Sequence, residues 1–374
     1  MTTAGPLAGV KVLDLGKFPP TAYCTQLLVQ LGADVVRVDA PGSNPVLFGQ
    51  GIGLSAEKRS VAVDQRHERG AEVLRKLAAW ADVLVENERP GVMDTRGFGP
   101  VVAAAELPSL IWCSMTGFGQ DGPYADWSGH DLSYTAYSGL LEGLSSTLPW
   151  HPESMLSVPL GALMAVVGIT SALYERTTTG KGTHLDISLA ESCTWLLTGF
   201  EGLLNGAGFR IPASPDRRLY QCGDGRFISV AAADKRTWAA LCAGLGLDDL
   251  AGAMPKSQDP GGWAPYVERL SAVFATKPAA EWVAQLGPTG AAVGPVYAPA
   301  ELAADPHAQA RHALVDVDGT LVPANPVRVV GVDAPATRPA PPAVGADTRA
   351  VLTAAGYTTA EVDTLVAEGA VATD

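Results

Sequence analysis

The sequence has no excess of positive charge. Its 374 residues carry 26 Lys and Arg against 39 Asp and Glu, which gives a formal net charge of −13. Proteins that bind nucleic acid or anionic membranes use stripes of basic side chains, which release counterions from the phosphates. Neither partner is expected here, and any phosphate must be bound by a local group of cations.

Cysteines are few, and their spacing does not suggest pairing. The five are an odd number, widely separated, with no Cys-x-x-Cys pair and no histidine placed to complete a zinc motif: Cys24, Cys113, Cys193, Cys222 and Cys242. Most lie in apolar runs, so we expect reduced core residues in a cytoplasmic protein and no metal.

The N-terminal residues lack the basic and apolar regions of a signal peptide. The longest apolar run, 158–173, contains glycine, threonine and serine and is short for a bilayer. We therefore expect a soluble protein without membrane contact. A helix over 158–176 is apolar nearly all round, which predicts that it is buried.

Strands and helices alternate along the first half of the chain. The pattern predicts strands at 9–15, 34–38, 59–63, 82–86, 109–116 and 184–189, with helices at 22–31, 68–80 and 158–176. Such alternation is typical of a mostly parallel sheet with helices on both faces. The sequence thus predicts an α/β fold.

Beyond Pro212 the pattern changes. A hairpin over 220–230, turning at Asp224 and Gly225, precedes helices at 238–245, 266–274 and 279–286. A proline-rich connector at 335–342 then leads to helices at 347–355 and 359–368. We expect a large α/β domain at 1–210, a small α+β domain at 211–325 and a C-terminal segment at 326–374.

A glycine-rich loop follows the strand at 109–116 and ends at His130. It contains a formal Gly-x-Gly-x-x-Gly at Gly117, Gly119 and Gly122, but Pro123 comes next and no helix opens there. A dinucleotide fingerprint requires that helix, so this interpretation is rejected. A histidine at a loop–helix junction is well placed for proton chemistry.

Polar residues recur at or just past the carboxyl ends of the predicted strands, where ligands of open α/β sheets bind. They are Lys17, Arg37, Asp64, Asn87, Arg89 and Arg96. Each could equally be a solvated surface group. The loop at 41–57 is long and glycine-rich, and loops of that length are more often functional than inert.

Five stretches together carry a resemblance to a known family. They begin at LAGVKVLDLGKFPP, KRSVAVDQ, ADVLVENERPGV, SLIWCSMTGFGQDGPY and SALYERTTTGKG, and they resemble the family III CoA-transferases, among them formyl-CoA transferase and α-methylacyl-CoA racemase. The likeness covers almost the whole chain. It implies a Rossmann-like large domain built from both chain ends, an interlocked homodimer and acyl-CoA thioesters as substrates.

The resemblance also implies roles for single residues. Lys17, Arg37 and Arg96 would contact CoA phosphates, and Val63, Asp64 and Asn87 would border the nucleotide. Arg89 joins this group through its position at a strand end. Gly119 and Ser157 would line the thioester pocket.

The sequence departs from the family at the expected nucleophile. Family transferases place an aspartate about ten residues before a Gly-Ile pair, and the equivalent pair here is Gly168 and Ile169, preceded by Ser157 instead. A serine cannot form the same acyl anhydride. Glu153 is the nearest upstream acid and would serve only if the loop shifted by about a turn.

Racemases of the family oppose the same aspartate with a histidine that a small-domain glutamate orients. His130 matches that histidine and Asp234 matches the glutamate position, so half of this constellation is present. A histidine paired with a carboxylate suits removal of an α-proton. Alternatively, Asp234 simply caps the helix that follows it, and Ser157 is only a helix-start residue.

These residues leave several functions open. We expect a CoA-transferase-like enzyme with an atypical site, in which His130, Asp234 and Ser157 are the catalytic candidates. The alternatives are α-proton chemistry on acyl-CoA by a racemase, isomerase or lyase, a non-catalytic subunit paired with an active paralogue, or binding of a different acyl carrier.

Overall fold

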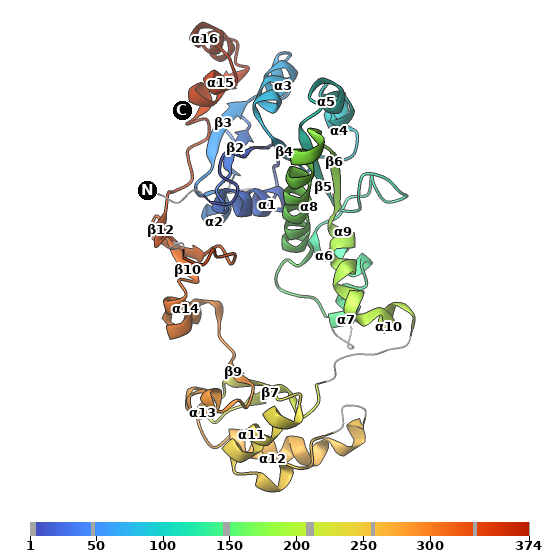
Figure 1. Cartoon of the computed structure of the whole chain (residues 1–374), viewed down its shortest axis with the longest axis vertical. Coiled ribbons are helices and arrows are strands. Elements are labelled where there is room, and N and C mark those ends of the chain that lie inside the picture. The colour runs from blue at the N-terminus through green and yellow to red at the C-terminus, as the bar shows by residue number, and fades with distance from the viewer. Residues whose placement is uncertain are drawn as a thin grey trace. The chain divides into compact units, whose positions relative to one another are not determined.

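A computed structural model describes residues 5–45, 49–144, 150–206, 213–255, 259–331 and 335–373. The chain forms two compact units (Figure 1). The large unit comprises Met1–Ala207 and Ala310–Asp374, and the small unit comprises Gly208–Gln309. The second boundary at Ala310 lies earlier than the residue 325 expected from the sequence.

A seven-stranded sheet forms the centre of the large unit, in the order β13-β3-β2-β1-β4-β5-β6. Its strands are β1 (Lys11–Asp14), β2 (Asp34–Asp39), β3 (Arg59–Val63), β4 (Val83–Glu86), β5 (Ile111–Thr116), β6 (His184–Ser188) and β13 (Val371–Ala372). All neighbours are parallel except β13, which pairs antiparallel with β3. The predicted mixed α/β fold with a mostly parallel sheet is confirmed.

Two apolar cores cover the two faces of this sheet, because its inner strands are buried on both sides; every residue of β5 is buried. One core gathers α3 (Gly70–Trp80), α15 (Thr348–Ala354) and α16 (Thr359–Ala367). The other gathers α1 (Pro19–Gln30) and α8 (Ser157–Thr179). The end of the chain thus packs against its beginning.

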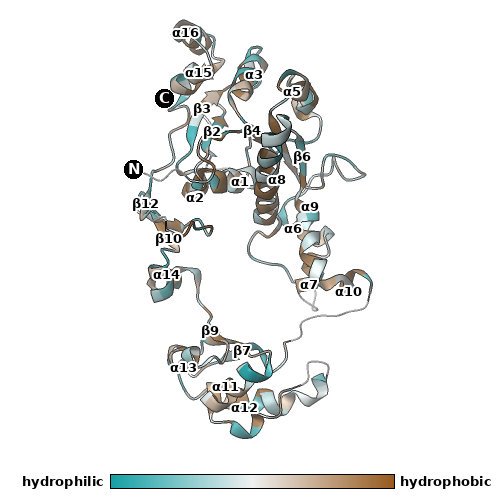
Figure 2. Cartoon of the chain, in the orientation of Figure 1, coloured by the Kyte–Doolittle hydropathy of each residue, from teal (hydrophilic) through white to brown (hydrophobic). Residues whose placement is uncertain are grey.

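Helix α8 is buried on one side only. It packs against α1 and β5, while Leu163, Val167 and Tyr174 on another side are 46%, 59% and 79% exposed. The expectation of a helix buried all round was wrong for this reason; its apolar character is visible in Figure 2. Among the described residues, α8 alone is long and apolar enough to cross a membrane, a test that a core helix of a soluble protein also passes.

Several elements were not predicted. The loop expected at 41–57 contains α2 (Ile52–Ser55), and a second sheet combines β10 (Leu314–Val317), β11 (Thr320–Pro323) and β12 (Thr337–Arg338). These segments have only two to four residues, too short to show periodicity. Arg338 contacts Glu57 at 3.0 Å and so links β12 to the end of α2.

The small unit combines a three-stranded antiparallel sheet with helices. Its elements are β7 (Arg217–Gln221), β8 (Phe227–Ala231), β9 (Val293–Pro295), α11 (Lys235–Leu245), α12 (Ala264–Phe274), α13 (Ala279–Leu286), and the 3-10 turns η3 (Asp248–Leu250), η4 (Pro260–Gly262), η5 (Gly287–Thr289) and η6 (Pro299–Ala304). Trp238, Phe274 and Trp282 occupy its core. The hairpin and the three predicted helices are confirmed.

Short helices connect the remaining parts. They are α4 (Val92–Thr95), α5 (Pro100–Glu106), α6 (Asp131–Tyr137), α7 (Leu140–Leu144), α9 (Leu189–Trp195), η2 (Leu196–Phe200), α10 (Glu201–Leu204) and α14 (Pro306–Ala310). Of these, α6 begins directly after His130, one of the predicted site residues, and packs beside α8.

Candidate functional site

The carboxyl ends of β1 and β4 bring two predicted phosphate ligands together. The Lys17 amide donates to Asn87 Oδ1 at 3.1 Å, and Lys17 Nζ contacts Glu88 Oε1 at 2.8 Å. Arg96 Nη1 contacts the same Glu88 oxygen at 2.9 Å. Parallel strands place their ends at one edge of a sheet, which explains why residues far apart in sequence meet here.

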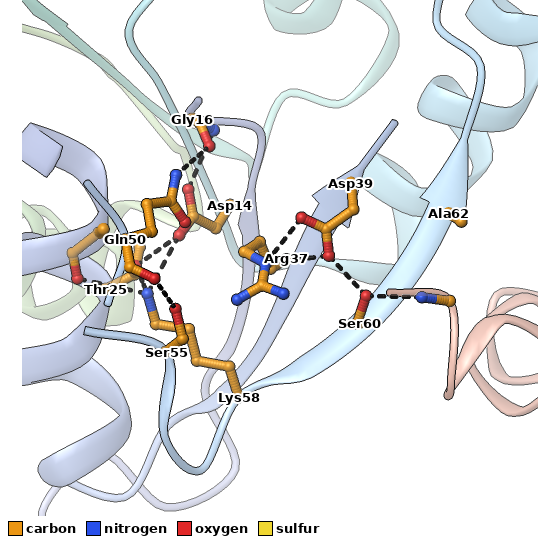
Figure 3. A network of polar contacts seen from close by, with 12 residues as sticks. Asp14, Gly16, Thr25, Arg37, Asp39, Gln50, Ser55, Lys58, Ser60 and Ala62 are labelled. Carbon is orange, nitrogen blue, oxygen red and sulfur yellow. Dashed lines mark hydrogen bonds and ion pairs between the residues drawn. The ribbon is translucent and has the colours of Figure 1, made fainter. Parts of the chain in front are cut away.

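Arg37 lies inside β2 rather than past its end, and it is 2% exposed. Its Nε contacts Asp39 Oδ1 at 2.8 Å, and Asp39 Oδ2 accepts from Ser60 Oγ at 2.6 Å (Figure 3). Among the described residues, Arg37 Nη1 and Gln50 Oε1 are buried without a hydrogen-bond partner. A buried donor of this kind is costly unless something accepts from it.

Arg37 and Gln50 line a pocket of about 470 Å³. The other lining residues are Ser43, Asn44, Pro45, Ile52, Ser55, Pro341, Pro342, Ala343 and Val344. The wall therefore combines the loop after β2 with the connector that precedes α15. A guanidinium with a free donor at the base of a pocket suits an anionic group such as a phosphate.

A fully buried polar cluster supports this pocket (Figure 3). Lys58 Nζ donates to Thr25 Oγ1 at 2.7 Å and contacts Asp14 Oδ2 at 3.4 Å, while Gln50 Nε2 donates to the Gly16 carbonyl at 3.1 Å. Burial lowers the pKa of Lys58, and the nearby Asp14 carboxylate partly opposes that effect. The cluster joins the end of β1 to α1 and to the segments that flank α2, and it borders the pocket through Gln50.

The other residues predicted to contact the nucleotide are either buried or already hydrogen-bonded within the chain. The Val63 side chain is fully buried in the core, so only its backbone could border a ligand. Asp64 Oδ1 accepts from the Arg66 amide at 2.9 Å, which forms a turn after β3. Arg89 Nη2 donates to Ser128 Oγ at 2.6 Å and thus ties the turn after β4 to the glycine-rich loop.

That loop needs its glycines because it wraps around one ring. A Cβ on Gly117 would lie 2.2 Å from Tyr134 Cε1, and a Cβ on Gly129 would lie 2.6 Å from the same atom. Gly119 has a φ of +92°, a conformation that favours glycine. The Tyr134 hydroxyl also donates to the Gly129 carbonyl. These contacts fix the position of the next residue, His130.

His130 is exposed and stands at the N-terminus of α6, and Asp131 follows it. The Asp131 carboxylate reaches the N-terminus of α8. It accepts from the Leu156 amide at 3.0 Å, from Ser157 Oγ at 2.8 Å and from the Val158 amide at 3.0 Å. A carboxylate at this point satisfies free N–H groups and interacts favourably with the helix dipole.

This contact brings His130 and Ser157 into one neighbourhood. Adjacent Cα atoms in a chain are about 3.8 Å apart, so His130 lies one residue from the side chain that binds Ser157. The two catalytic candidates differ in accessibility. Ser157 is fully buried and its hydroxyl donates to Asp131, whereas His130 is open to solvent.

The sequence pattern does not single out Asp131, although this residue follows His130 directly at the end of the glycine-rich loop. The resemblance predicts a carboxylate only in the segment directly before α8, whereas Asp131 reaches the start of α8 from another helix. Glu153, the acid that was considered, is exposed in the segment before α8. Its role stays a prediction.

Asp234 lies in the small unit and caps α11. Its Oδ1 accepts from the Arg236 amide at 2.9 Å and from the Thr237 amide at 3.0 Å, and these bonds lower the pKa of the carboxyl. Within its own unit, Asp234 thus acts as the N-cap of α11, the alternative to a catalytic role that the sequence left open. Pairing with His130 stays a prediction. The described residues include no group of His, Cys, Asp or Glu able to hold a metal ion.

A family model described as CoA-transferase family III matches residues 7–348. The alpha-methylacyl-CoA racemase of Mus musculus is 33% identical over 369 residues, covering 95% of each chain. The acetyl-CoA:oxalate CoA-transferase of Acetobacter aceti is 30% identical over 375 residues, covering 90% of this chain and 92% of the relative.

A solved structure shares the fold. The crystal structure of a CAIB/BAIF family protein from Brucella suis superimposes with a TM-score of 0.81 and 27% sequence identity, covering 94% of this chain and 100% of that one. The similar proteins thus include enzymes of two kinds, a racemase and a transferase.

Proposed function

This chain belongs to CoA-transferase family III, and on that premise we propose that it transfers protons at the α-carbon of an acyl-CoA thioester, with His130 as the acid/base group. One observation carries the proposal. Asp131 binds the start of α8 and so holds the exposed His130 beside the position where the family's aspartate is replaced by the buried Ser157.

The proposed chemistry needs only groups of this chain. The neutral His130 ring accepts the α-proton, and the electron pair of the broken C–H bond moves onto the thioester oxygen to give an enolate. The imidazolium then returns a proton to carbon. Because Ser157 is not an acid/base group near neutral pH, the proton returns to the same face of the α-carbon from which it left.

The nucleotide end of the substrate is proposed to lie at the other end of the site. Arg37, with its free buried donor, would contact a phosphate in the pocket that Gln50 also lines. Lys17 and Arg96 would contribute further positive charge beyond β1 and β4. The described contacts of Arg37, Lys17 and Arg96 support this assignment, which the resemblance first suggested.

A second candidate is CoA transfer with Asp131 as the nucleophile, which the carboxylate at the N-terminus of α8 favours. Transfer would require a carboxylate oxygen to leave its amide partners and attack the thioester carbonyl, forming a mixed anhydride and releasing CoA thiolate. We rank this second because three groups at the start of α8 already bind that carboxylate: the Leu156 and Val158 amides and the Ser157 hydroxyl.

A homodimer, a pairing with an active paralogue and a cytoplasmic location remain proposals. The five cysteines are buried and free, which supports a reducing compartment. The exposed apolar side of α8, with Leu163, Val167 and Tyr174, supports association with another chain.

The test is incubation with several acyl-CoAs in deuterated buffer, following α-deuterium by mass and CoA transfer to added acids. We expect exchange without transfer, and loss of exchange in His130→Ala with unchanged CoA affinity. His151→Ala, which removes another exposed histidine of the large unit, is the matched control. Full exchange in His130→Ala would refute the proposal, and transfer in the wild type would favour the second candidate.

A further inference from the structure

The most unusual feature of the proposed phosphate site is an acid inside it. Glu88 Oε1 contacts Lys17 Nζ at 2.8 Å and Arg96 Nη1 at 2.9 Å, so one carboxylate oxygen already binds both cations. Glu88 is 18% exposed, and its partners are 47% and 21% exposed. The three side chains together carry a net charge of only +1.

Glu88 is also held firmly in place. Its amide donates to Glu86 Oε2 at 2.6 Å, and Glu86 is 3% exposed at the end of β4. Arg96 is fixed from a second side, because its Nη1 contacts Gln65 Oε1 at 3.0 Å. The cations lower the pKa of Glu88 despite its partial burial, which keeps the carboxylate ionised near neutral pH.

A phosphate that approaches these cations meets Glu88 in either of two ways. It can displace the carboxylate, which then loses both partners, or it can bind beside it, where two anions lie within a few ångströms. Like charges at such distances oppose binding, and partial burial limits the screening by water. Either route weakens binding of an anionic ligand at this edge of the sheet.

We propose that Glu88 is an internal counter-ion that lowers affinity for the phosphates of CoA and thereby shifts the specificity of the site toward thioesters that carry fewer phosphates. The inference rests on the proposed CoA-thioester function. Glu88 acts on the nucleotide end of the ligand and takes no part in the chemistry at His130.

The experiment measures the Kd of CoA and of acetylated pantetheine, which lacks phosphates, by calorimetry. We expect Glu88→Gln to tighten CoA binding about tenfold, which corresponds to about 1.4 kcal/mol, and to leave pantetheine binding unchanged. Glu106→Gln is the matched control, because Glu106 pairs with Arg75 at 3.3 Å and its loss changes net charge equally. Glu88→Ala provides a second variant, and thermal unfolding verifies that each folds.

The outcomes separate this inference from the proposed function. Unchanged or weaker CoA binding in both Glu88 variants would overturn it, since Glu88 would then only position the cations. Equal tightening in Glu106→Gln would overturn it as well, because net charge alone would explain the effect. If the Glu88 variants bind CoA more tightly but the wild type shows no α-proton exchange, the counter-ion role of Glu88 is supported and the chemistry assigned to His130 is refuted.

Discussion

Replacing Asp131 by alanine tests the contact that joins the two halves of the proposed reaction centre. The substitution removes the acceptor for two amides at the start of α8 and the charged acceptor of the buried Ser157 hydroxyl, which keeps only the backbone carbonyl of residue 131 at 3.3 Å. Loss of a helix cap costs about 0.5–2 kcal/mol, and loss of a hydrogen bond to a charged group costs about 1.5–3 kcal/mol. We therefore expect a loss of roughly 3 kcal/mol, or a decrease in Tm of roughly 6–12 °C for a unit of this size.

The assay is calorimetric unfolding, combined with the α-deuterium exchange assay below the transition. Asp131→Asn keeps one acceptor oxygen but loses the charge, so we expect about half of the effect on Tm. Asp126→Ala is the control, because it removes an exposed aspartate of the preceding loop. We also expect slower exchange in both Asp131 variants, since His130 loses its anchor. A Tm within 2 °C of wild type in Asp131→Ala would refute this role for the carboxylate.

Two further predictions concern the neighbouring groups. Ser157→Asp places a second carboxylate beside Asp131. We expect this variant to racemise 2-methylacyl-CoA instead of only exchanging its α-proton on one side, as measured by chiral analysis of the product. Exchange with unchanged configuration would contradict the assignment of His130 and residue 157 to opposite sides of the α-carbon. Burial raises the pKa of Glu86 above its ordinary value, so the folded chain binds this proton more tightly than the unfolded chain and loses stability as pH rises through that range. The Tm of Glu86→Gln minus the Tm of the wild type, measured between pH 4 and 8, should therefore increase as pH rises. A difference that does not change with pH would show that Glu86 does not titrate in this range.

The sequence predicted the framework of both units well, because strand and helix periodicity is a local signal. The strand at 59–63 coincides with β3, and the helix at 279–286 coincides with α13. The elements that were not predicted from the sequence are short and show little periodicity. Short segments such as β13 form only because a distant strand accepts them, since Val371 pairs with Val63.

The candidate site was predicted in part. Strand ends are readable from the sequence, so Lys17, Asn87 and Arg96 were correctly expected at one edge of the sheet. The direction of a side chain within a strand is harder to read, and Arg37 therefore emerged as a buried group inside β2. Contacts between segments that are distant in sequence cannot be read from periodicity, so the sequence predicts neither the contact of Asp131 with α8 nor the pairing of Glu88 with two cations.

The pairing of β13 with β3 has a consequence for how the chain acquires its fold. The Asp347 carboxylate accepts from the Ser60 amide, and Thr348 Oγ1 accepts from the Ala62 amide, across separations of 287 and 286 residues. During synthesis, the small unit emerges whole before these partners of β3 exist. The small unit can thus fold on the ribosome before the β3 edge of the central sheet is covered, because that edge stays open until Val371 and Ala372 have emerged.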